Sequence, residues 1–216
     1  MRGPQFDQIA EAYLLERLAP AGWEKVGKSM FVRRDAGGMD KLALDPGRGF
    51  DKFAVLMAYE PTDVSEFLGA LQADDAYDPA ASGFMCGPYL SLGKVGPRKH
   101  TWPSATPERL LASMERFMAA FTQMGRPWLD TLRDPLALAA NVDENAAAAA
   151  GYVWERAGNE AKASSLYLNW LGRLRGGQEL FGHKDPPARH MKEYLFLAAR
   201  IGLEDELTSR YRAALG

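Results

Sequence analysis

The chain has 216 residues, of which 47% are hydrophobic and 25% are charged, a composition that is typical of a globular protein and excludes a disordered one. Its 26 basic and 28 acidic side chains leave a net charge of −2, without the basic excess that nucleic-acid binding requires. The single cysteine, Cys86, excludes an internal disulfide and a thiol-rich metal site. Residues 1–17 lack a signal-peptide core, and no apolar run reaches the roughly 20 residues of a membrane span, so we expect a soluble, cytoplasmic protein.

The first predicted element is an amphipathic helix close to the start of the chain. Apolar residues recur at steps of three and four between Phe6 and Leu18, which is the spacing of one helix face. Pro20 and Gly22 then interrupt the pattern, so the helix is expected to end just before them.

Short strands are predicted after this helix. Leu42 and Leu44 alternate with Lys41 and other small or polar residues, as in a strand with one buried face. Residues 45–49 contain the proline and glycines of a turn, and the run 53–59 is apolar on both faces, which indicates a central strand. Short connections favour antiparallel pairing, so the first part of the chain is predicted to be an α+β domain with a small antiparallel sheet.

The next segment begins with a short predicted helix. Asp63 and Glu66 have the spacing of a capping box, and the helix is expected to extend to Leu71. Residues 74–88 are predicted to form a loop and residues 89–92 one more strand.

A long helix is predicted from Pro107, with Thr106 as its N-cap, and Gly125 and Pro127 are expected to interrupt it. Everything after Pro135 is predicted to be helical. The expected helices, near 143–157, 160–175, 187–201 and 203–215, would form two helical hairpins. The predicted domains are therefore an α+β domain at 1–134 and a helical extension at 135–216, which either stands alone or docks on the first domain as one unit.

The order of several short motifs resembles the DUF4304 family of uncharacterised, mostly bacterial proteins. The motifs are a helix followed by Gly22–Phe31, the strand pair at 41–44 and 53–59, Tyr89–Gly93 leading to Trp102, and a helix ending in Pro127–Leu129. They cover about residues 4–133, and the segment 74–86 is longer than in the family pattern. The family has no established activity, so the resemblance implies a fold and not a reaction.

One predicted hairpin in the C-terminal part resembles a tetratricopeptide unit. The small and aromatic positions that match the pattern are Gly151, Trp154, Ala163 and Tyr167. Trp170 stands where a small residue is expected, and Arg175 replaces the closing proline. Because stacked repeats need about three copies, this single degenerate hairpin is expected either to bind another protein or to dock on the neighbouring domain.

The densest polar cluster precedes the long helix. Its candidate ligand-binding residues are Arg98, Lys99, His100 and Trp102, with Lys94 nearby. Arginine is a bidentate donor for carboxylates, and tryptophan offers a stacking wall. In the alternative interpretation the segment is a solvated loop that Trp102 anchors to the core. Likewise, the aromatic residues of the sheet either line an apolar cleft or pack against the helix at 107–124.

No sequence pattern indicates a cofactor, a metal site or catalytic residues. His183 and His190 are seven positions apart, unlike the i,i+4 pair of a helical metal site. Cys86 lacks the basic neighbour that a reactive thiolate requires. The sequence therefore favours a protein that is not an enzyme, but it does not decide the question.

The leading hypothesis is a non-catalytic module that contacts another protein, with Trp154, Tyr167 and Trp170 as candidate contact residues. One version, by analogy with small bacterial domains, is an immunity-type protein that neutralises a toxin. The alternative is a small-molecule-binding protein or enzyme that uses the sheet face and the 94–102 loop. A homodimer formed by the C-terminal hairpins is a third hypothesis, and neither nucleic acid nor a membrane is expected as a partner.

Overall fold

A computed structural model describes residues 3–27, 29–47, 49–72, 89–91, 94–96, 101–181 and 188–216. The chain divides into two compact units, one made of Met1–Thr62 with Pro79–Val142 and the other of Asp63–Asp78 with Asp143–Gly216. The predicted class is confirmed, because the first unit combines helices with an antiparallel sheet and the C-terminal part is helical.

The first unit contains the strands of the protein that the structure describes. Its elements are α1 (Gly3–Leu18), β1 (Glu24–Val26), β2 (Met30–Arg34), β3 (Gly38–Pro46), β4 (Lys52–Pro61), β5 (Tyr89–Ser91), β6 (Lys94–Gly96), β7 (Trp102–Pro103), α3 (Pro107–Ala120), α4 (Arg126–Thr131) and α5 (Pro135–Asn141). The sheet has the order β1-β2-β3-β4-β5-β6, and β7 also pairs with β4. Each of these pairings is antiparallel, as predicted from the short turns.

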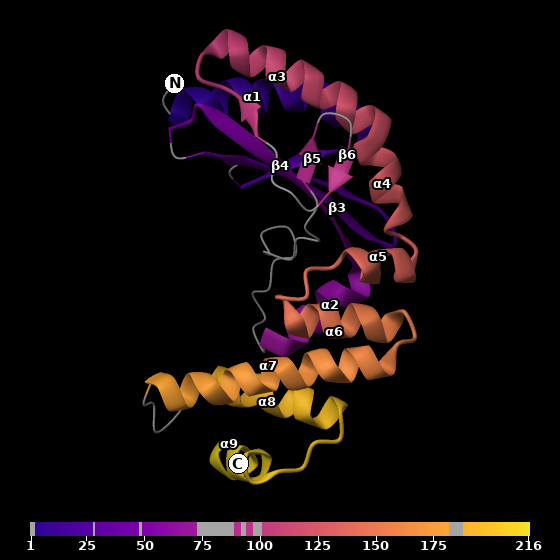
Figure 1. Ribbon diagram of the computed structural model, residues 1–216, viewed down its shortest axis with the longest axis vertical. Helices are drawn as coiled ribbons and strands as arrows, with labels where there is room; N and C mark the ends of the chain where they lie inside the picture. Colours follow the sequence, from indigo (N-terminus) through magenta and orange to yellow (C-terminus); the bar gives the residue numbers. More distant parts are fainter. Residues whose placement is uncertain are drawn as a thin grey trace. The chain divides into compact units, whose positions relative to one another are not determined.

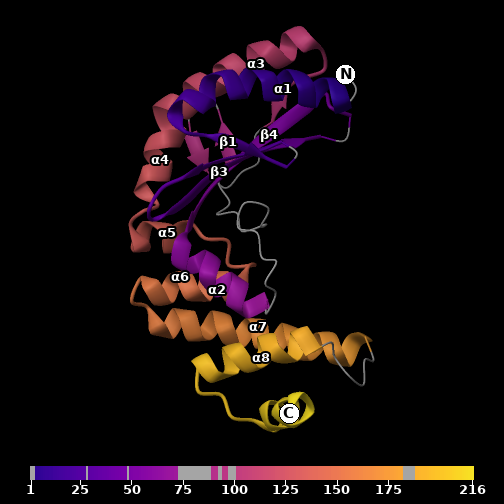
Figure 2. The same ribbon diagram turned by 180° about the vertical axis from the view of Figure 1, so that it is seen from behind.

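Helices α1 and α3 lie side by side over one face of the sheet (Figures 1 and 2). The ring of Phe6 in α1 lies 5.8 Å from that of Phe53 in β4, and the ring of Phe117 in α3 lies 6.3 Å from that of Trp102 in β7. All four side chains are buried. The aromatic face of the sheet is therefore packed core and not an open cleft.

Helix α1 follows its sequence pattern closely. Its buried side chains, Phe6, Ala10, Leu14 and Leu18, are four positions apart and form one face. The chain leaves the helix through the short 3-10 turn Ala19–Ala21, and Gly22 follows in a left-handed conformation with φ of 81°. Glycine adopts this conformation without steric cost, which explains why the helix ends where predicted.

Helix α3 begins as predicted but does not break at Gly125. The Thr106 hydroxyl accepts a hydrogen bond of 3.3 Å from the Arg109 amide, which caps the helix. A π-helical turn, Phe121–Gly125, then continues α3 directly into α4. A side chain at Gly125 would come within 2.6 Å of the Phe121 ring, so glycine permits close packing here rather than ending the helix. Pro127 falls in the first turn of α4, where the missing amide proton costs least.

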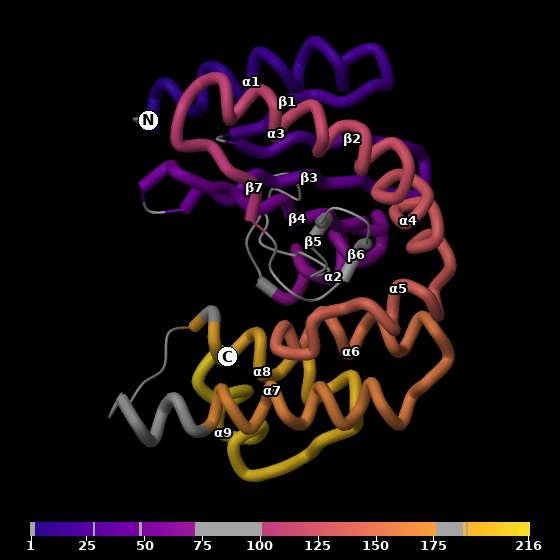
Figure 3. Tube along the Cα trace, turned by 45° about the horizontal axis from the view of Figure 1, so that its top comes forward, coloured from indigo at the N-terminus to yellow at the C-terminus, as the bar shows by residue number. Residues whose placement is uncertain are grey.

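The second unit is a succession of helices. They are α2 (Thr62–Gln72), α6 (Ala147–Arg156), α7 (Glu160–Phe181), α8 (Ala188–Arg200) and α9 (Glu206–Leu215). Helix α6 packs on α7, α7 on α8, and α8 on α9 (Figure 3). In Figure 1, α7 and α8 run across the view, whereas α9 is seen end-on. Within the described ranges, no helix combines the length and hydrophobicity needed to cross a membrane.

Three sequence expectations for these segments differ from the structure. The predicted boundary after residue 134 does not coincide with the division into units, because α5 belongs to the first unit and α2 almost entirely to the second. The predicted end of a helix near residue 175 is wrong, since α7 continues to Phe181. The capping box is also wrong, because α2 already begins at Thr62, and the Asp63 carboxylate in its first turn binds Arg156 at 2.5 Å.

Candidate functional site

Of the four predicted ligand-binding residues, the structure describes only Trp102. Arg98, Lys99 and His100 lie outside the described residues. Trp102 is 1% exposed and packs between the rings of Phe53 and Phe117, at centroid distances of 6.5 and 6.3 Å. This tryptophan therefore anchors its segment in the core, and its ring is not accessible for stacking on a ligand.

The three predicted partner-binding aromatics lie in α6 and α7 and are only partly accessible. Tyr167 is 1% exposed, so it cannot form a broad contact surface, although its edge lines a pocket. Trp170 is half-buried, and its indole nitrogen donates a hydrogen bond of 2.7 Å to Glu193. Trp154 is also half-buried, and its indole nitrogen has no hydrogen-bond partner among the described residues.

The pocket lies where the end of α6, the start of α7 and the end of α8 meet. Its volume is about 290 Å³. The residues that line it are Glu155, Glu160, Ala163, Ser164, Tyr167, Arg200 and Ile201. All of them belong to the second unit. This volume is at the lower end of the range for ligand sites, so the pocket suits one side chain or a small molecule.

A bidentate ion pair forms one side of this pocket. The Arg200 guanidinium donates from Nε and Nη2 to the two carboxylate oxygens of Glu155, each at 2.8 Å. The Tyr167 hydroxyl donates to the same carboxylate at 2.9 Å. The hydrogen bonds from Arg200 lower the pKa of Glu155 in spite of its partial burial, while burial and the Glu155 charge raise the pKa of Tyr167. At neutral pH the site therefore holds a carboxylate, a guanidinium and a neutral phenol.

Two stacked rings support the guanidinium of Arg200. The rings of Phe67 in α2 and Tyr152 in α6 lie 4.4 Å apart and nearly parallel, at 4°. The Arg200 guanidinium lies 5.2 and 4.9 Å from their centroids, within the range of a cation–π contact. The Tyr152 hydroxyl donates to Asp63 at 3.4 Å, and Asp63 also pairs with Arg156. Contacts with α2 and α6 thus fix the position of Arg200 at the end of α8.

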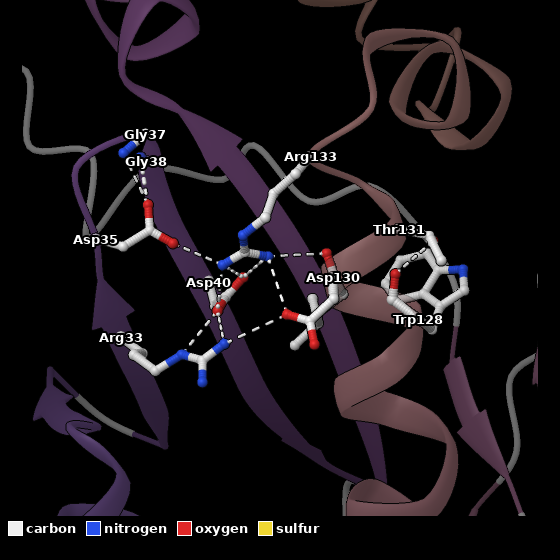
Figure 4. A network of polar contacts seen from close by, with 10 residues as sticks. Arg33, Asp35, Gly37, Gly38, Asp40, Trp128, Asp130, Thr131 and Arg133 are labelled. Atoms are coloured by element: carbon white, nitrogen blue, oxygen red, sulfur yellow. Dashed lines mark hydrogen bonds and ion pairs between the residues drawn. The ribbon is translucent and has the colours of Figure 1, made fainter.

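A second polar cluster lies in the first unit (Figure 4). The register places Arg33 opposite Asp40 across β2 and β3, and Asp40 opposite Tyr59 across β3 and β4. The Asp40 carboxylate is fully buried and accepts hydrogen bonds from Arg33 at 2.6 Å and from Arg133 at 3.2 Å. Arg133 also binds Asp35 at 2.6 Å and lies 4.7 Å from the centre of the Tyr59 ring.

This cluster joins the end of α4 to the sheet. Partial burial of Asp35 opposes its ionisation, but hydrogen bonds from Arg133 and from backbone amides outweigh this effect and lower the pKa of the carboxyl. Hydrogen bonds to Asp35 and Asp40 raise the pKa of Arg133 in spite of its partial burial. Since its charges are paired with one another, we assign this cluster a structural role.

A buried ion pair occupies the opposite face of the sheet. The Lys41 ammonium lies 2.5 Å from the Glu60 carboxylate, and both side chains are 0% exposed. Lys41 pairs with Ala58 and Glu60 with Met39, so the two charges are diagonal neighbours across β3 and β4. The alternating pattern of β3 had placed Lys41 on a solvent face. This prediction is wrong, because that face is buried too.

The three comparisons with known proteins, against family models, curated proteins and solved structures, find no match for this chain. The resemblances to the DUF4304 family and to a tetratricopeptide unit therefore stay predictions. Within the described residues, no group of three or more histidine, cysteine, aspartate or glutamate side chains is placed to hold a metal ion.

Proposed function

We propose that this protein is a non-catalytic binding protein that contacts another protein through the helices of its second unit. The observation that carries the proposal is the pocket between α6, α7 and α8, in which Glu155, Arg200 and Tyr167 are held in fixed positions. Preorganised polar groups of this kind fix the orientation of a bound group at little entropic cost.

The succession of helices supports a protein as the ligand. Helices that pack in chain order, each on the next, present a continuous surface, and repeat proteins use such surfaces to bind other chains. A pocket for one side chain within that surface supplies specificity, while the surrounding helices supply contact area.

An exposed leucine lies beside the pocket. Leu168 is 51% exposed and stands four positions after Ser164 on α7, so the two side chains are neighbours on one helix face. A single exposed leucine is common on protein surfaces, but one next to a polar pocket provides the apolar contact that a binding surface needs.

This proposal is tested by capture of partners from the native lysate with matched variants. We expect a protein retained by the wild-type chain to be lost by Leu168→Glu, because a charge would be buried at the interface. Leu136→Glu is the control, since Leu136 is 61% exposed but belongs to α5 of the first unit. Equal capture by all three chains, or no stoichiometric protein partner, would contradict the proposal.

Mass spectrometry of the captured protein also tests the immunity-type version, in which the partner is a toxin.

The same preparation tests the second candidate function, small-molecule binding at the sheet. That candidate is favoured by the buried Lys41–Glu60 pair, because ionisable groups buried in a core are expensive and are often kept for function. A metabolite retained by the wild-type chain and lost in Glu60→Gln would support it.

A further inference from the structure

We propose that the pocket between α6, α7 and α8 receives a basic side chain, a lysine or arginine, of the protein partner. This inference rests on the proposed function and specifies the chemistry of the contact.

The ion pair in the pocket is already complete. Glu155 accepts three hydrogen bonds, two from Arg200 and one from Tyr167, and its charge is balanced by the guanidinium. The stacked rings of Phe67 and Tyr152 hold Arg200 in this pair. These groups therefore form a rigid wall, and an incoming cation has to be recognised by the other polar residues of the pocket.

The remaining polar side chains can both accept hydrogen bonds. Glu160 is exposed at the first position of α7, and Ser164 lies one helical turn further along the same face. In the part of the chain that the structure describes, Glu160 has no ion pair and the Ser164 hydroxyl has no hydrogen bond. A carboxylate and a hydroxyl four positions apart are suited to an ammonium or guanidinium donor.

The local charge also favours a cation. Two carboxylates and one guanidinium line the pocket, which leaves one net negative charge. The C-terminal ends of α6 and α8, where the helix dipole places partial negative charge, both border the pocket, whereas only α7 contributes an N-terminal end. The size of the pocket and its apolar members, Ala163 and Ile201, suit the methylene stem of one long basic side chain.

The experiment is a titration of the full-length, ¹⁵N-labelled protein followed by NMR. The probes are N-acetyl-lysine methylamide and, for comparison, N-acetyl-glutamate methylamide. We expect saturable shifts at the amides of Glu160, Ser164 and Ile201 with the lysine probe alone. Because Nη1 of Arg200 keeps donors that an acid could use, saturable binding of the glutamate probe at the same amides would overturn the inference, as would absence of saturable binding by the lysine probe.

Matched variants separate recognition from structural damage. We expect Glu160→Gln to weaken binding of the lysine probe about fivefold and Ser164→Ala to weaken it less. The controls are Glu206→Gln, at the corresponding first position of α9, and Ser165→Ala, the exposed neighbour on α7. Neither control should change the affinity, and an effect of the controls equal to that of the pocket variants would count against the site.

The same variants distinguish this inference from the function on which it rests. If Glu160→Gln captures the partner from the lysate as well as the wild-type chain does, the protein-binding function stands. The inference that the pocket receives a basic side chain is then wrong. If no protein is captured but the lysine probe binds the pocket, the protein-binding function fails, and the site recognises a free amine instead.

Discussion

At the scale of single residues, Asp205 shows how one carboxylate joins several elements. It caps α9 by accepting hydrogen bonds of 2.8 Å from both the amide and the hydroxyl of Thr208. The same carboxylate accepts a hydrogen bond of 2.9 Å from the Tyr194 hydroxyl of α8 and forms an ion pair with Arg175 of α7. Although partial burial opposes ionisation, these hydrogen bonds and the charge of Arg175 lower the pKa of Asp205 to about 2.

We predict that Asp205→Asn lowers the free energy of unfolding by about 2 kcal/mol at pH 7. Because the pKa is depressed in the folded state, this stabilisation is present above pH 3.8 and is lost as the pH falls through about 2. Urea unfolding at a series of pH values should show the difference from the wild-type chain shrinking in that window. The control Glu204→Gln removes an exposed partner of Arg212 and should change the stability far less than Asp205→Asn does. A constant difference for Asp205→Asn at all pH values would refute the linkage.

At the scale of elements, α6 and α7 are locked together by a small residue facing an aromatic one. A side chain at Gly151 would lie 2.5 Å from the Tyr167 ring, so only glycine lets the two helices approach this closely. The same contact positions the Tyr167 hydroxyl on Glu155 and thereby shapes the pocket.

We predict that Gly151→Ala destabilises the protein by about 1–3 kcal/mol, although alanine is the better helix former, because the ring of Tyr167 has to move. Gly172→Ala is the matched control, since nothing lies within 4 Å of a side chain at this position of α7. It should stabilise the protein by up to about 1 kcal/mol. Thermal unfolding of both variants gives the comparison, and stabilisation by both would show that the helices separate without cost.

At the scale of the whole molecule, the two units exchange segments of chain. Helix α2 follows β4 directly in the sequence, yet Phe67 stacks on Tyr152 of α6. Helix α5 follows the predicted boundary at residue 134, yet it belongs to the first unit, where Leu138 and Ala139 are buried. A cut between residues 134 and 135 therefore removes one helix from the first unit and leaves α2 without α6.

We predict that a chain ending at residue 134 exposes the apolar face of α2 and aggregates or binds a hydrophobic dye. The buried ring of Phe67 would lose its contacts with Tyr152, Tyr167 and Phe196. Dye fluorescence and sedimentation measure the outcome, and a soluble, cooperatively unfolding fragment would contradict it.

The homodimer hypothesis is better tested by sedimentation of the full-length chain, with Leu168→Glu as the variant.

The elements that the sequence predicted best are those whose signal is local. The four-residue spacing of Phe6 to Leu18, the turn between β3 and β4 and the cap at Thr106 depend on contacts within a few positions of the chain, although β3 extends to Pro46, two positions into the predicted turn. Two glycines misled the prediction for a physical reason: Gly125, and Gly176 directly after the expected helix end near residue 175. Glycine weakens a helix only slightly, and packing against Phe121 and Met57 at the first of these positions outweighs that cost.

Only part of the candidate site could be predicted from the sequence. The resemblance to a tetratricopeptide unit named Gly151 and Tyr167 among four matching positions, and the structure packs these two residues against each other. Arg200 gave no signal, since an arginine near the end of a helix is common. Its role depends on Glu155, which lies 45 positions earlier in the chain.

The sequence by itself determined the fold class, the antiparallel order of the first strands and the helical C-terminal part, because periodicity and turn residues act over short distances. Only the tertiary structure decided which charges are buried and which meet. It brought Lys41 to Glu60 across two strands and Arg200 to Glu155 across two helices. Such pairs form between residues far apart in the chain, and their energy depends on burial that only packing creates.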